Sequence, residues 1–224
     1  MRKRKNEIFS AIKENIQNNL KAYIVICVIF AVGIFFGVMI VNQTEDKSQI
    51  ENYINTYIDE TKLIENGDYL HELQKDIKDN IILVFSLWFA GTTIIGIPIV
   101  FGIILFRGFC LGYTIASCVF VLGKLKGIMF ILMTIFLQNI IFIPAIIMLG
   151  VSSIKLYTSI IKDRRKENIK LSIIKHCIIS IIILLALIVS SIIKVEISYR
   201  MVINLIKYFW KICKIYLHFG KSLI

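Results

Sequence analysis

Long runs without a charged residue dominate this sequence and restrict it to one class of fold. The first covers residues 22–41, and four more cover 81–106, 108–123, 127–154 and 177–193. A helix needs about 20 consecutive apolar residues to cross a bilayer, whereas the strands of an outer-membrane barrel alternate apolar with polar residues. We therefore expect an all-α polytopic membrane protein with five transmembrane helices, or six if the C-terminal tail also crosses.

The composition agrees with this class. Hydrophobic residues make up 57% of the chain and charged residues 18%, against roughly 45–50% and about 25% in soluble domains. The five cysteines show no C-x-x-C spacing, and the first four lie within or beside the apolar runs. We interpret them as small hydrophobic residues, so a disulfide-rich secreted scaffold is excluded.

The first run has one competing interpretation, a signal peptide, because the basic residues before it resemble an n-region. The run is long, contains Gly33 and Gly37, and has no clear small-x-small cleavage site before Asn42. We therefore interpret it as a retained transmembrane helix.

Lysine and arginine are unevenly divided between the segments that join the runs. Six precede residue 22 and seven lie in 155–176, which with Arg107 places 14 on one side and six on the other. Short cytoplasmic loops carry this excess in membrane proteins, so we expect a cytoplasmic N-terminus and a cytoplasmic basic loop at 155–176. The loop 42–80 is then external, and it holds ten of the fifteen acidic residues.

We divide the chain into a cytoplasmic amphipathic segment at 1–21, an integral membrane domain at 22–199 and a basic amphipathic tail at 200–224. Apolar residues recur at every fourth position of the first segment, which is typical of a helix lying along the membrane. Polar residues of the tail keep to one helical face, which indicates a helix on the bilayer surface that anionic lipid attracts. A sixth transmembrane helix is the alternative for this tail.

The spacing of apolar residues predicts two short helices in the external loop. They recur at helical intervals over 50–58 and again over 70–81. These apolar faces either pack on each other and on the membrane surface, or dock a partner. For docking, the candidate residues are Tyr53, Tyr57 and Leu70.

The sequence lacks the common catalytic signatures H-E-x-x-H, G-x-S-x-G and G-x-x-x-x-G-K-[ST]. Its histidines are scattered, and a solvated helix face explains the position of His71 beside Asp68 and Glu72. We therefore expect no catalytic, metal-binding or cofactor-binding residue and no enzymatic activity.

Polar and helix-breaking residues inside apolar runs suggest a function, because placing them in the bilayer is energetically unfavourable. The candidates are Gly96, Pro98, Arg107, Gln138, Asn139 and Pro144. Arg107 stands between two runs, 81–106 and 108–123, so we expect it at the bend of a helical hairpin, near the cytoplasmic headgroups. If the chain instead breaks at 96–98, Arg107 lies deeper in the membrane.

Pro144 removes a backbone donor and frees the carbonyl of Ile140. The amides of Gln138 and Asn139 can repair such a break, bond a neighbouring helix or contact a transported solute. We favour the structural role.

Three stretches resemble the stage II sporulation protein M family of endospore-forming bacteria. They read GIFFGVMIVN at 33–42, GTTIIGIPIVFGIILFRGFCLG at 91–112 and LQNIIFIPA at 137–145. Together with the order of the runs, the resemblance covers about residues 20–197.

This resemblance implies a non-catalytic membrane anchor of a peptidoglycan-remodelling complex with stage II sporulation proteins D and P. It further implies a role in forespore engulfment and a place in the mother-cell septal or engulfing membrane, without a cofactor. The alternative is a permease subunit whose helix breaks line a solute path. The sequence gives that alternative little support, because it has no internal repeat and its apolar runs contain no acidic residue.

Overall fold

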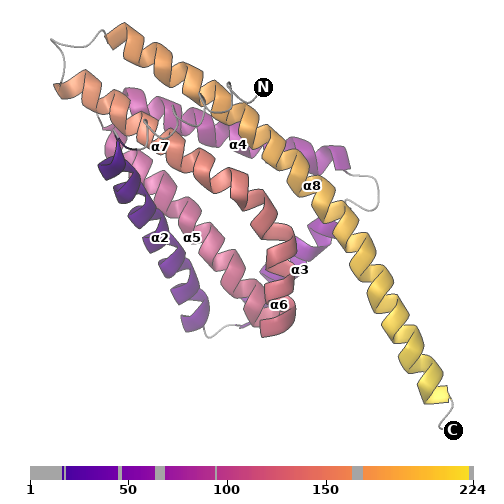
Figure 1. The fold of residues 1–224 in the computed structure, drawn as a ribbon. Helices are drawn as coiled ribbons and strands as arrows, with labels where there is room; N and C mark the ends of the chain where they lie inside the picture. The colour runs from indigo at the N-terminus through magenta and orange to yellow at the C-terminus, as the bar shows by residue number, and fades with distance from the viewer. Residues whose placement is uncertain are drawn as a thin grey trace.

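The computed structural model describes residues 17, 19–44, 47–63, 69–93, 95–162 and 169–221, and most of their side chains as far as Glu196. The described residues form helices and short turns, with no strand among them (Figure 1). The helices are α2 (Leu20–Gln43), α3 (Lys47–Leu63), α4 (Tyr69–Thr92), α5 (Gly96–Leu122), α6 (Lys124–Ile131), α7 (Leu137–Lys162) and α8 (Ile169–Lys221). A π-helical turn at Leu132–Phe136 joins α6 to α7. The amphipathic segment expected at 1–21 lies almost entirely outside the described residues.

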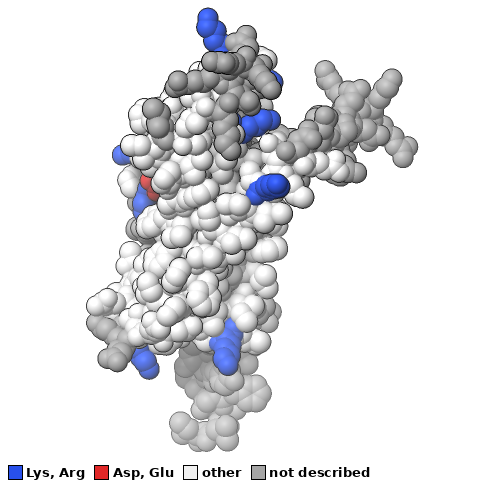
Figure 2. Space-filling model, turned by 90° about the vertical axis from the view of Figure 1, so that its left-hand side faces the viewer, with Lys and Arg blue, Asp and Glu red and all other residues white. Residues whose placement is uncertain are grey.

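Four helices are long and apolar enough to cross a membrane: α2, α5, residues 138–161 of α7 and residues 169–196 of α8. Large apolar side chains remain on their outer faces, and Phe35 and Phe106 are 64% and 61% exposed. Figure 2 shows charged side chains toward the upper and lower ends of one face and a white, uncharged band across its middle. The expected all-helical membrane protein is therefore confirmed, with four helices that meet the length and composition of a span.

The apolar run 81–106 does not form one helix, which corrects the expected hairpin bend at Arg107. The chain turns between α4 and α5, where the amide of Gly96 donates to the carbonyl of Thr93 at 3.1 Å. A Cβ at Gly96 would lie 2.8 Å from the carbonyl carbon of Ala90, so only glycine fits this close approach. Pro98 is the third residue of α5, where its missing N–H removes no helical hydrogen bond. The bend therefore forms at the helix-breaking residues, and α5 continues through Arg107 as far as Leu122.

The last two spans are longer than their uncharged runs. α7 continues past residue 154 to Lys162, and α8 continues through Tyr199 to Lys221 as one helix of 53 residues. Its yellow end projects away from the other helices in Figure 1. A sixth transmembrane helix would need a turn after Tyr199, and the described backbone has none there. The tail is thus continuous with α8, and its side chains lie outside the described residues.

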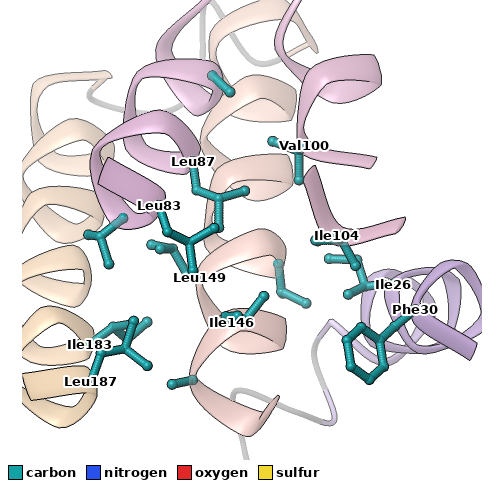
Figure 3. Close-up of a cluster of buried hydrophobic side chains, with 14 residues drawn as sticks. Ile26, Phe30, Leu83, Leu87, Val100, Ile104, Ile146, Leu149, Ile183 and Leu187 are labelled. Carbon is teal, nitrogen blue, oxygen red and sulfur yellow. The ribbon is translucent and has the colours of Figure 1, made fainter. Parts of the chain in front are cut away.

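The core of the bundle receives side chains from five helices, α2, α4, α5, α7 and α8 (Figure 3). Its buried members include Ile26, Phe30, Leu83, Leu87, Val100, Ile104, Ile146, Leu149, Ile183 and Leu187. α4 supplies Leu83, Val84 and Leu87, which are at most 5% exposed. Although its first half is charged, α4 is therefore an integral part of the bundle.

Candidate functional site

The helices α2 and α5 approach each other closely along a glycine seam, which we define as Gly33 and Gly37 of α2 with Gly108 and Gly112 of α5. All four are buried. A Cβ at Gly112 would lie 2.8 Å from the Cα of Ile34, and one at Gly37 would lie 2.6 Å from the amide nitrogen of Tyr113. Each pair has Gly-x-x-x-Gly spacing, which places small residues on one helical face and lets two backbones approach.

The glycine seam also shows the relative direction of the two helices. Gly108 packs against the backbone of Phe30, and Gly112 packs against Ile34, one turn further along both helices. α2 and α5 are therefore parallel. As a result, the first residues of α5 lie on the same side of the bundle as the first residues of α2.

Arg107 lies near the middle of α5 and is half-buried, a position that agrees with the alternative of a chain break at 96–98. Its neighbour Gly108 packs on Phe30, which is near the middle of the apolar run 22–41. The guanidinium carbon stands 5.7 Å from the centre of the Phe142 ring, a cation–π contact between α5 and α7. Within the described part of the chain Arg107 has no ion pair.

Gln138, Asn139 and Pro144 lie on α7, and two of them take part in hydrogen bonds within the bundle. The side-chain amide of Asn139 donates to the carbonyl of Ile135 at 2.7 Å, inside the π-helical turn. Ser190 of α8 donates to the backbone carbonyl of Gln138 at 3.2 Å. Pro144 is exposed on the outer surface of α7. The amide of Asn139 thus has a structural bond, but to the carbonyl of Ile135 rather than Ile140, and Gln138 contributes its backbone carbonyl and not the predicted side-chain amide.

The helix α3 lies against the second half of α5, and the described aliphatic residues in the first part of α3 are buried. Ile50 and Ile54 are fully buried. The hydroxyl of Tyr53 donates to Thr114 at 2.9 Å, because Thr114 itself donates to the carbonyl of Cys110. Burial raises the pKa of the Tyr53 hydroxyl, which therefore keeps its proton at neutral pH.

The three candidate docking residues have different surroundings. The ring of Tyr53 also meets Tyr113 edge-on, with centroids 5.2 Å apart, yet the residue remains 40% exposed. Leu70, at the start of α4, is 67% exposed. The side chain of Tyr57 lies outside the described residues. Leu70 is thus the most accessible of the described candidates.

Sequence analysis missed a row of polar contacts between α4 and α8. Lys194 forms an ion pair with Asp76, and Asn80 donates to Ser191 at 2.8 Å. Toward the other end of this pair of helices, the indole of Trp88 donates to the sulfur of Cys177 at 3.4 Å. The i, i+4 spacing of Asp76 and Asn80 at the edge of an apolar run could have indicated this row.

A buried histidine links α8 to α7. The Nδ1 atom of His176 lies 2.8 Å from the hydroxyl of Ser152, and the imidazole is only 2% exposed. The ring faces Gly91 of α4, where a Cβ would lie 3.2 Å from Nε2. No group of three or more histidine, cysteine or acidic side chains suited to a metal ion occurs among the described residues.

Comparison with protein families places most of the chain in one of them. The family model of stage II sporulation protein M matches residues 26–198. The chain belongs to the stage II sporulation protein M family. The match begins in α2 and ends in α8, so it includes the glycine seam and the polar row between α4 and α8. Neither the curated proteins nor the solved structures contain a match to the chain.

Proposed function

We propose that this sporulation membrane protein is a non-catalytic scaffold of a peptidoglycan-remodelling complex needed for forespore engulfment. Its partners are stage II sporulation proteins D and P, and its place is the mother-cell septal and engulfing membrane. Membership of the stage II sporulation protein M family is the observation that carries this proposal. A scaffold of this kind raises the effective concentration of wall-cutting enzymes by confining them to one membrane surface.

The proposal includes five membrane crossings, with α4 as the fifth. Support comes from the parallel packing of α2 and α5 at the glycine seam. Two consecutive parallel spans require the chain between them to return across the bilayer, and α4 is the helix available for this return. Its contacts agree, because Asp76 meets Lys194 near the end of the apolar part of α8, residues 169–196, and Gly91 meets His176 near the start of that part.

With the N-terminus in the cytoplasm, this topology places α3 and the first turns of α4 outside the cell. The contacts of Tyr53 and Ile54 with α5 hold α3 on the bundle, so it offers a fixed external surface. Since Ile50 and Ile54 are already buried, the accessible start of α4 around Leu70 is the described part of the loop best suited to a partner.

Affinity capture of the tagged protein from sporulating cells tests this proposal. The unaltered chain should recover both wall-cutting proteins, and Leu70→Asp should reduce their recovery while the membrane level of the protein stays unchanged. Gln74→Ala is the matched control, because Gln74 is exposed one turn further along α4. If capture of the unaltered protein recovered neither enzyme, this result would contradict the proposed scaffold function.

One observation favours the alternative of a permease subunit. Arg107 is a half-buried charged residue near the middle of α5, and charged residues within membrane helices often mark the path of an ion or substrate. A permease predicts that Arg107→Gln abolishes uptake of a solute while partner capture is unchanged. A scaffold also predicts unchanged partner capture by Arg107→Gln, but it predicts that solute uptake does not depend on this protein.

A further inference from the structure

A cavity of about 270 Å³ opens between α2, α7 and α8. It lies at the end of the bundle where α7 ends and α8 begins, at the upper left of Figure 1. In the proposed topology this end meets the cytoplasmic headgroups. Its charged residues, Lys155 of α7 and Lys175 of α8, line the cavity from two different helices.

The cavity is cationic and rich in hydroxyl groups. Tyr23, Ser152, Ser172 and His176 complete the polar lining that the described residues give it, and none of these lining residues is a carboxylate. Among the described residues neither lysine forms an ion pair. Two ammonium groups without a carboxylate between them attract an anion, and hydroxyl groups can donate to its oxygen atoms.

A second cavity, of about 220 Å³, adjoins the first on the other side of Lys155. It shares Val151 and Lys155 with the first cavity and adds the polar residues Asn19, Thr158 and Ser159. Lys155 therefore stands between two hollows at the same end of the bundle. An anion bound beside Lys155 would therefore be surrounded by polar groups from α2 and α7.

The first cavity also has an apolar side. Met148, Val151 and Ile179 line it toward the bundle, and Ile178 is 52% exposed on the outer surface of α8. A small inorganic anion gains nothing from such a surface, whereas an acyl chain does. The combination of a cationic end and an apolar side thus fits an amphiphile better than a soluble anion.

We infer that this cavity binds the phosphate of an anionic phospholipid between Lys155 and Lys175, with an acyl chain along Ile178. Basic pockets between membrane helices on the cytoplasmic side are known to hold anionic headgroups. The inference is independent of the scaffold function, because it concerns the purified chain and its lipid alone. Its failure would leave partner capture unaffected.

Native mass spectrometry of the full-length protein in detergent tests this site by titration with phosphatidylglycerol and with phosphatidylcholine. Each lysine near an anionic headgroup contributes about fivefold in affinity, so Lys155→Gln with Lys175→Gln should weaken phosphatidylglycerol binding by at least about tenfold. The control pairs Lys170→Gln with Lys124→Gln, which removes the same charge from exposed lysines outside the cavity. This control should change binding by less than about twofold.

Two further results are decisive. Lys155→Arg with Lys175→Arg keeps both charges and should retain phosphatidylglycerol binding, which separates a charge effect from a folding defect. Equal loss in the cavity and control variants would overturn the site. Competition by inorganic phosphate or glycerol phosphate at the concentration of the lipid would also overturn it, in favour of a soluble anion.

Discussion

Asp76 and Lys194 join α4 to α8 through a single ion pair. Their side chains are 12% and 23% exposed, so water screens the pair only in part. Removing one partner of a buried pair is more harmful than removing both, because the remaining charge keeps its desolvation penalty. At the scale of single residues, this pair and the neighbouring bond from Asn80 to Ser191 align the two helices.

Asp76→Asn should therefore lower the free energy of unfolding by about 1–3 kcal/mol, a range between exposed and fully buried pairs. A lower Tm of the detergent-solubilised protein would show this loss. Asp79→Asn is the control, since Asp79 is exposed three residues further along α4 and should leave Tm unchanged. Exchanging the two charges, Asp76→Lys with Lys194→Asp, should restore part of the stability. Equal Tm values for Asp76→Asn and Asp79→Asn would contradict this role of the pair.

The helices α2 and α5 pack through glycine rather than through large side chains. Little hydrophobic driving force acts between helices in lipid, so their association depends on close backbone contact. The glycine seam supplies that contact over more than one helical turn. Both halves of the seam were visible as Gly-x-x-x-Gly spacings, but their pairing required the structure because each spacing by itself fits many partners.

Gly112→Leu should disrupt the packing of α2 on α5, because even a Cβ at this position would lie 2.8 Å from the Cα of Ile34. We expect a loss of about 3 kcal/mol or more, at the upper end of the range for overpacking. Size-exclusion chromatography of the solubilised protein should show a smaller monodisperse fraction. Gly102→Leu is the matched control on the same helix, since a Cβ there meets nothing within 4 Å. Similar profiles for the two variants would contradict the seam.

At the scale of the whole molecule, the number of crossings decides which surfaces reach the outside. Four helices satisfy the length and composition of a span, and α4 does not because its first half is charged. In the proposed topology, α4 supplies the return across the bilayer between the parallel helices α2 and α5. The side of the membrane on which the turn between α4 and α5 lies therefore distinguishes four crossings from five.

Single cysteines in a cysteine-free background, treated with a membrane-impermeant maleimide, test this topology. Gln49→Cys on α3 should react in intact cells. Ile95→Cys, at the turn between α4 and α5 where Ile95 is 70% exposed, should react only after permeabilisation. Reaction of both cysteines in intact cells would show that α4 does not cross. Lys170→Cys at the start of α8 serves as a cytoplasmic reference.

Local features of the sequence were enough to predict the class of fold. Whether a segment enters the bilayer depends on the summed transfer free energies of its own residues, so the apolar runs predicted the membrane helices α2, α7 and α8. The helix α5 was not predicted as one span, because it joins the end of the run 81–106 to the run 108–123. Motif order likewise indicated the stage II sporulation protein M family, which the family match over 26–198 confirmed. The candidate intramembrane residues were identified for the same reason, because a polar or helix-breaking residue inside an apolar run is visible without any neighbour.

Tertiary structure alone decided how these parts meet. The contact of Tyr53 with Thr114 and the ion pair of Asp76 with Lys194 depend on residues far apart in the chain. The bend is local, but the folded backbone placed it at Gly96 instead of Arg107. A charged residue can continue a helix or end it, and an apolar face can meet lipid, a partner or another helix of the same chain. Only the packing of complementary faces distinguishes these outcomes, and that packing brought Lys155 and Lys175 to one cavity although they are twenty positions apart in the sequence.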